Sequence, residues 1–294
     1  MSDQTGRLKL VFRKKQTGIT YVPQAYFTEP MRVVSPFYED DDGTAFLYLL
    51  NLSGGVVGGD MLLTDVTVED HARALLTTTS ANKLYRMVPG KRAVIRNDFT
   101  VGEDGVLEYL PECSIPFAES ETIQNSEFRL SESSYLFTVD AVTPGRIDRG
   151  ELFSFREYTS NVKIYVDDRL MVYEKTRIRP DDPDLFHDGV MEAFTHYASV
   201  YIYHADMDRS FVDEVNRMNG QQADRYAGDS TGNDAFKSGN DAFRAAATLI
   251  DDRIAVIRIL SNGMIDVENC IHRMWDLSRR RFLGKHAVKL RKEH

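Results

Sequence analysis

The sequence predicts a mainly β protein whose few α-helices lie near the C-terminus. Most of the first two hundred residues form short runs rich in β-branched and aromatic side chains, the residue types that fit a pleated, half-buried surface. Turn-forming stretches such as 41–43 and 103–105 separate these runs. Amphipathic helical spacing appears only after residue 207. Short strands spaced by roughly 8–12 residues favour a sandwich, a barrel or a β-helix.

The predicted strands follow one another along the chain with turn formers between them. The runs that we expect to be strands are residues 8–12, 19–27, 31–38, 45–52, 62–68, 74–79, 93–101, 106–110, 128–130, 135–142, 153–158, 161–166, 169–178, 198–204 and 253–260.

Two helices and one loop are expected in the last third. Residues 208–218 place apolar side chains at helical spacing, with Asp208 or Ser210 as the N-cap. Residues 267–283 do the same, and Gly284 would end that helix. Residues 219–244 are polar and glycine-rich and contain a short tandem echo, so they predict a mobile surface loop.

Composition limits the class of protein. The 294 residues carry a net charge of −9, which argues against general nucleic-acid binding. The polar and basic N-terminus lacks a signal-peptide pattern, and no apolar run approaches the roughly 20 residues that span a bilayer. We therefore expect one cytoplasmic domain over residues 1–294, with no membrane contact and with Cys113 and Cys270 as free thiols.

The sequence shows no signature of a nucleophile elbow, a zinc helix, a P-loop or a Cys-x-x-Cys pair. Its glycine-rich segment carries Gly54, Gly55, Gly58 and Gly59 directly before Asp60, and a strand pattern follows. Paired glycines indicate backbone with positive φ or a close approach of two chains. Asp60 can cap that turn or face a cavity as a metal-contacting carboxylate.

Several segments together resemble the UreD (UreH) family of urease accessory proteins. The glycine turn is followed by a Leu-Thr-Thr segment that continues to Lys83, Tyr85 and Arg86. Farther along the chain, residues 107–112 resemble the family's Leu-Glu-Trp-Leu-Pro-Gln element. Gly145 and Arg146, with Gly150 and Glu151 behind them, resemble its Gly-Arg…Gly-Glu segment, and residues 281–285 resemble its C-terminal helix end. The matches run in order from about residue 30 to about residue 285.

The resemblance implies a β-helix-like fold of layered strands and a non-enzymatic role. Family members bind UreF, which recruits the GTPase UreG, and dock on apo-urease, where Ni²⁺ passes through a tunnel. No tightly bound cofactor is implied, only transient Ni²⁺. Oxygen ligands suit a path that must bind nickel weakly at each step. The tunnel residues expected from the resemblance are Asp60, Glu108, Glu112, Asp140, Glu151, Thr77, Thr78 and Ser80.

Other interpretations stay open at this point. The carboxylates, Glu108 and Glu112 above all, also fit solvated surface positions. Trp275 fits a core position, or an exposed anchor for UreF together with Arg280 and Arg281. Asp140 and Glu151 could form the acid/base pair of a carbohydrate-active β-helix enzyme. A purely structural adaptor that never contacts nickel is the third alternative.

Overall fold

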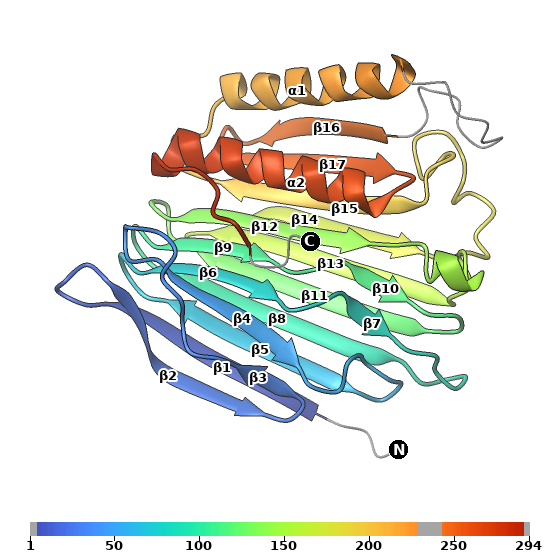
Figure 1. Cartoon of the computed structure of the whole chain (residues 1–294), viewed down its shortest axis with the longest axis horizontal. Coiled ribbons are helices and arrows are strands. Elements are labelled where there is room, and N and C mark those ends of the chain that lie inside the picture. The colour runs from blue at the N-terminus through green and yellow to red at the C-terminus, as the bar shows by residue number, and fades with distance from the viewer. Residues whose placement is uncertain (1–4, 229–242, 291–294) are drawn as a thin grey trace.

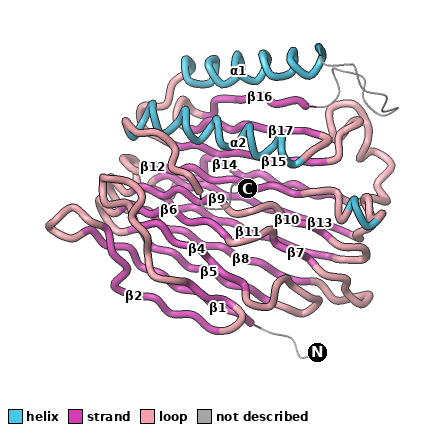
Figure 2. Tube along the Cα trace, in the orientation of Figure 1, coloured by secondary structure: helices cyan, strands magenta, loops and turns pink. Residues whose placement is uncertain are grey.

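The computed structural model describes residues 5–228 and 243–290. Two β-sheets lie face to face as layers, and the two long helices lie at one end of the assembly (Figure 1). Strands are the most frequent element of the trace in Figure 2. The predicted class, layered β-helix-like strands with helices near the C-terminus, is confirmed. No helix among the described residues is long and apolar enough to cross a membrane.

Sheet A has seven strands in the order β14-β13-β11-β8-β5-β1-β2, and its five inner strands run parallel. Its strands are β1 (Thr5–Lys14), β2 (Thr20–Thr28), β5 (Met61–Val68), β8 (Ala93–Val101), β11 (Glu121–Leu130), β13 (Glu157–Val166) and β14 (Arg169–Ile178).

Sheet B follows the order β16-β17-β15-β12-β9-β6-β4-β3. The short strand β10 pairs with β12, and β7 pairs with β10. The strands of sheet B are β3 (Met31–Val33), β4 (Ala45–Asn51), β6 (Arg73–Thr78), β7 (Asn82–Leu84), β9 (Val106–Leu110), β10 (Ser114–Pro116), β12 (Tyr135–Val142), β15 (His196–Tyr203), β16 (Phe243–Ile250) and β17 (Ile254–Ser261).

From β4 to β13 the chain alternates between the two sheets, as in a solenoid, and this gives the molecule two unlike edges. Connections from the long strands of sheet B to sheet A are long, and they form the long-loop edge at residues 52–60, 79–92, 111–120 and 143–156. The second and third of them contain the short strands β7 and β10. Connections from sheet A to sheet B have four residues each, and they form the short-turn edge at residues 69–72, 102–105 and 131–134. Between the sheets lies one large cluster of buried apolar side chains, which includes Leu10, Val66, Phe99 and Phe128.

The helices cover the outer face of sheet B. Helix α1 (Arg209–Gly228) contacts β16, while α2 (Met264–Ser278) contacts β15 and β17 and continues into a π-helical turn (Arg279–Leu283). Asp208 caps α1 by accepting the backbone N–H of Phe211, and Gly284, with a φ of 67°, ends the second helix; both were predicted.

Several boundaries differ from the predictions. The strand predicted over 31–38 ends at Val33, and the strand predicted over 128–130 begins already at Glu121. The loop predicted over 219–244 is wrong for residues 219–228, which continue α1, and for 243–244, which begin β16; residues 229–242 lie outside the described residues. Glutamine, alanine and arginine in the 219–228 segment are good helix formers despite their polarity. The strand predicted over 153–158 begins only at Glu157, because the preceding loop turns at Phe153, where φ is 48°.

Candidate functional site

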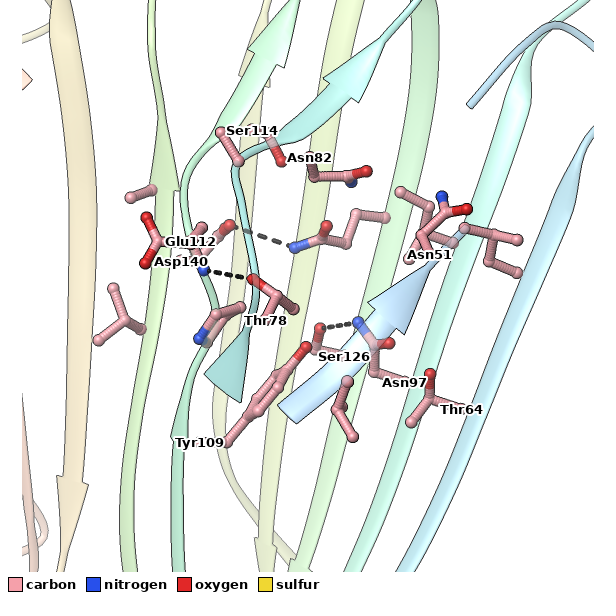
Figure 3. A pocket seen from close by; sticks show the side chains of 18 of the residues that line it. Asn51, Thr64, Thr78, Asn82, Asn97, Tyr109, Glu112, Ser114, Ser126 and Asp140 are labelled. Carbon is pink, nitrogen blue, oxygen red and sulfur yellow. Dashed lines mark hydrogen bonds between the residues drawn. The ribbon is translucent and has the colours of Figure 1, made fainter. Parts of the chain in front are cut away.

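A cavity lies between the two sheets beneath the long-loop edge. Its volume, counted as the space open to the centre of a water molecule, is about 110 Å³, whereas one water needs roughly 10–15 Å³ on that measure. The cavity therefore has room for several waters or for a hydrated cation. Figure 3 shows its polar side chains converging from both sheets; the labelled residues are Asn51, Thr64, Thr78, Asn82, Asn97, Tyr109, Glu112, Ser114, Ser126 and Asp140.

Sheet A contributes a row of neutral polar side chains. Thr64, Asn97 and Ser126 are register partners on β5, β8 and β11, so they point to the same face. All three are buried, and the amide Nδ2 of Asn97 donates to Oγ of Ser126 at 3.2 Å. In β5 and β8 the inward positions on either side of the row are apolar, whereas in β11 the row is flanked by Gln124 and Phe128. The row therefore makes a polar band in a largely apolar wall.

Sheet B contributes the carboxylates. Oδ1 of Asp140 accepts hydrogen bonds from Nε2 of Gln124 and from the hydroxyl of Tyr158, each at 3.2 Å. Glu112 is fixed through its backbone, whose N–H donates to Oγ1 of Thr78 at 2.9 Å. Burial raises the pKa of Asp140 above its usual range, since the charged form loses solvation between the sheets. A cation beside Asp140 would restore its charged form.

A second polar cluster continues from Asp140 toward β17. Asp140, Ser199 and Arg258 are register partners on β12, β15 and β17. Across from them, Glu174 on β14 accepts hydrogen bonds from the Tyr197 hydroxyl at 2.8 Å and from Oγ of Ser199 at 3.0 Å. The guanidinium of Arg258 donates to the same carboxylate at 2.7 Å and is itself about half exposed. This cluster therefore reaches from the cavity wall to the surface.

The structure brings together some of the predicted tunnel residues. Thr78, Ser80, Glu112 and Asp140 line the cavity, and so do Gly54, Gly55 and Lys83. Four others are absent from the lining: Asp60, Thr77, Glu108 and Glu151.

Asp60 and Thr77 serve local structure. Oδ2 of Asp60 accepts the backbone N–H of Val57 at 3.0 Å, so its carboxylate caps the glycine turn. The fully buried Thr77 donates its hydroxyl to the carbonyl of Leu110 at 2.6 Å, which joins β6 to β9. Of the two roles that the sequence allowed for Asp60, turn capping is the one the structure supports.

Glu108 is neither a solvated group nor part of the cavity. Its carboxylate is fully buried on the outer side of sheet B, where it accepts Nε1 of Trp275 at 2.5 Å and Nε of Arg279 at 2.7 Å. Arg279 also donates to Asp40 at 2.6 Å. Two carboxylates therefore surround one buried guanidinium and fix α2 to the sheet.

The alternative of Trp275 as an exposed anchor is wrong, because its side chain is fully buried against sheet B. Arg280 and Arg281 are each about half exposed and pair with Asp276 at 2.9 Å and Asp208 at 3.1 Å. Their role in partner binding stays a prediction.

The glycine turn behaves as predicted. Gly54 and Gly59 have positive φ values of 72° and 99°. A Cβ at Gly55 would lie 2.5 Å from the carbonyl oxygen of Lys83, and a Cβ at Gly58 would lie 2.9 Å from Cβ of Lys91. The first two long loops therefore touch backbone to backbone beside the cavity.

A stack of side chains joins the remaining family-like segments along the long-loop edge. The ring of Tyr85 packs edge-on against Phe117 with centroids 5.1 Å apart, and the guanidinium of Arg146 lies 3.9 Å from the centre of the Phe117 ring. Arg146 pairs with Glu151 through two hydrogen bonds, and Glu151 also accepts the backbone N–H of Ala118 at 3.1 Å. The hydrogen bonds to Arg146 hold the pKa of Glu151 below its usual range.

The other residues of these segments shape or flank the edge. A Cβ at Gly145, whose φ is 124°, would lie 2.3 Å from the carbonyl of Glu151, and Gly150 ends the short 3₁₀ turn there with a φ of 74°. Arg86 is exposed and pairs with Glu119 at 2.6 Å.

Sequence reasoning missed Thr64, Asn97, Ser126, Gln124 and Glu174. A signal was present for the first three, since each is a polar residue in the inward phase of an alternating strand, and the phase recurs in three successive strands. Glu174 carries the same signal, since it is the charged residue in the inward phase of β14, between Val172 and Thr176.

The cavity offers single carboxylates among hydroxyl and amide oxygens. Within residues 5–228 and 243–290 no group of three or more His, Cys, Asp or Glu side chains is arranged to hold a metal ion. Hard and borderline cations such as Mg²⁺, Mn²⁺ or Ni²⁺ accept such oxygen donors. The arrangement can solvate a passing cation.

Comparisons with known proteins all point to one family. Residues 4–294 match the family model described as UreD urease accessory protein. The chain is 31% identical to the urease accessory protein UreD of Bacillus sp. (strain TB-90), over 98% of each chain. It is 31% identical to that of Paenarthrobacter aurescens, over 94% of this chain and 91% of the relative. It is 35% identical to that of Acetivibrio thermocellus, over 69% of this chain and 77% of the relative.

Proposed function

Because this chain belongs to the UreD family of urease accessory proteins, we propose that it is a non-enzymatic cytoplasmic scaffold that helps to load nickel into apo-urease. It acts with UreF and UreG, which bring Ni²⁺ to it, and it docks on apo-urease to pass the ion on. The observation that carries the nickel role is the cavity between the sheets, with Glu112 and Asp140 among hydroxyl and amide side chains.

The donor set of the cavity suits transfer better than storage. Nickel binds tightly to clusters of imidazole or thiolate ligands, whereas separate carboxylates, hydroxyls and amides bind it weakly. Glu112 lies in a long loop, whereas Asp140 lies on β12. An ion that passes through the cavity therefore meets carboxylates carried by separate elements.

The polar cluster beyond Asp140 supplies a continuation of the path. Ser199 follows Asp140 in the same register row, and Glu174 lies against it with Tyr197. Arg258 is the last member and reaches solvent. We assign one side of the nickel path to the exposed loop residues Thr79 and Ser80 of the cavity lining, and the other side to Arg258.

The direct test is co-expression of apo-urease, UreF and UreG with and without this chain, followed by measurement of urease activity and of nickel bound per active site. The proposal expects both to rise only when the chain is present. Equal nickel loading without the chain would contradict it.

Two alternatives predict different outcomes. A structural adaptor that never contacts nickel would keep full loading when Glu112 and Asp140 lose their charge. A carbohydrate-active enzyme would need Asp140 and Glu151 to act on one substrate, yet Asp140 is bonded to Gln124 and Tyr158, whereas Glu151 is held by Arg146 outside the cavity lining.

A further inference from the structure

Large apolar side chains are exposed to solvent on the long-loop edge. Val88 is 64% exposed, Leu152 51% and Ile147 48%. The three turns of the short-turn edge contain no large apolar residue at all. Exposed aliphatic side chains that gather on one surface indicate a contact with another molecule more often than scattered ones do.

Hydrogen bonds join the loops that carry these side chains. The guanidinium of Arg156 donates to the carbonyl of Val88 at 3.3 Å, so the second long loop lies against the start of β13. The backbone N–H of Glu119 donates to the carbonyl of Ser154 at 2.9 Å, and Oγ of Ser154 donates to the carbonyl of Leu152 at 3.3 Å. Three successive long loops are thereby joined into a continuous face.

The same face is locally basic. Residues 79–92 contain four Lys or Arg residues and no Asp or Glu, in a chain whose net charge is −9. Arg86 and Arg92 are 73% and 54% exposed at their side chains. Arginine beside aliphatic side chains is a typical composition for the centre of a protein interface.

The backbone of this face is held in an unusual conformation. Glu119 and Phe153 both have positive φ values, 61° and 48°, a region that bulky side chains rarely adopt. The stack of Tyr85, Phe117 and Arg146 lies directly behind these loops. Loops that are fixed in this way present their exposed side chains in one arrangement, which lowers the entropic cost of docking.

We propose that Arg86, Val88, Ile147 and Leu152, here called the edge patch, form the surface that docks on apo-urease. The inference rests on the proposed function, which supplies the partner. The complementary surface of apo-urease should carry aliphatic side chains, which pack against the aliphatic residues of the patch, surrounded by carboxylates, which pair with its arginine. Thr79 and Ser80, at the exposed end of the cavity lining, belong to the same loop as Val88. Docking at the edge patch therefore places the cavity next to the protein that receives the metal.

The test measures the dissociation constant between the full chain and purified apo-urease, at low and at high salt. The variant carries Val88→Asp and Leu152→Asp, and a second variant carries Arg86→Glu. Leu170→Asp is the matched control, because Leu170 is 47% exposed and follows the turn between β13 and β14, at the end of these strands opposite to the long loops. Thermal unfolding of each variant checks that it is folded, and size-exclusion chromatography records self-association.

We expect the double variant to bind apo-urease at least roughly tenfold more weakly, in the range seen when interface anchors are removed. Arg86→Glu should weaken binding most at low salt, and Leu170→Asp should bind like the parent chain. Parent-like binding by the double variant would overturn the inference and leave the proposed function standing. The same holds if the patch proves to mediate only self-association. Failure of the parent chain itself to bind apo-urease would instead contradict the proposed function, and the inference with it.

Discussion

The two edges of the solenoid are built from the same strands but differ in length, chemistry and strain. At the short-turn edge, the four-residue turns are joined to one another by hydrogen bonds, such as the backbone N–H of Glu103 to Asp70 at 2.9 Å and Oγ of Ser131 to the carbonyl of Gly102 at 2.8 Å. At the long-loop edge, loops of nine to fourteen residues carry glycine contacts, an aromatic–arginine stack and the cavity lining.

Even the residues with positive φ differ between the edges. At the short-turn edge these are His71 and Asp104, which pair with each other at 3.3 Å and are of the types that tolerate this conformation. At the long-loop edge they include Glu119 and Phe153, which are not. We infer that one edge stabilises the fold and the other carries function.

The largest effect should come from removing a carboxylate charge at the functional edge. Glu112→Gln keeps the shape of the side chain but removes the charge, so we expect nickel transferred to apo-urease to fall by roughly tenfold or more, as for other lost metal-site contacts. Glu103→Gln, at an exposed position of the short-turn edge, should leave transfer unchanged. Nickel content after reconstitution with UreF and UreG is the readout, and equal losses in both variants would erase the distinction between the edges.

A Cβ at Gly55 should be the most damaging small change to stability on the long-loop edge. It would lie 2.5 Å from the carbonyl of Lys83 and 2.6 Å from the Tyr85 ring, so Gly55→Ala should lower the free energy of unfolding by about 1–3 kcal/mol. Gly90→Ala is the control, because a Cβ there meets nothing within 4 Å, although its φ of 81° adds a cost of about 1–2 kcal/mol. Urea denaturation measures both, and a milder effect at Gly55 than at Gly90 would contradict the close approach.

Substitutions at the short-turn edge should change the stability of the fold but not the transfer of nickel to apo-urease. Ser131→Ala removes the hydrogen bond to Gly102, so we expect a loss of about 0.5–1.5 kcal/mol in the free energy of unfolding. Nickel loading by the folded variant should match that of the parent. A variant that unfolds normally but fails to load urease would assign function to this edge too.

The smallest effect concerns pH. Arg146 lowers the pKa of Glu151 in the folded protein, so the charged pair contributes stability above the unfolded pKa of about 4.3, and this contribution is lost as pH falls through the lower folded pKa. The parent should therefore melt at a higher temperature than Glu151→Gln at pH 6, and the gap should close toward pH 3. A gap that is independent of pH would show that the two hydrogen bonds, and not the charge, hold the loop.

Much of the fold could be predicted from the sequence, because alternation and turn formers act locally. The strands at 93–101, 106–110, 135–142 and 169–178 have the predicted bounds, and the glycine turn has the predicted conformations. The end of α1 was missed because a polar composition resembles that of a loop even where the residues favour helix.

The cavity could be predicted only in part. Thr78, Ser80, Glu112 and Asp140 were found because they lie in or near family-like segments. The same segments also contain Glu108, which is buried against Arg279 on the other side of sheet B. Strand alternation puts neighbouring residues on opposite faces, but only the tertiary structure determines what covers each face. Glu174 accepts a hydrogen bond from Ser199, which lies beside Asp140 because β15 pairs with β12. The local sequence does not encode this contact.

The most direct test of the account is Asp140→Asn in the reconstituted system of apo-urease, UreF, UreG and nickel. Binding of the variant to apo-urease and its melting temperature should stay at parental values or rise, since burial already disfavours the charged carboxylate. Nickel bound per urease active site should fall to the level measured without the chain. Parental nickel loading by a well-folded, urease-bound Asp140→Asn chain would contradict the passage of nickel between the sheets.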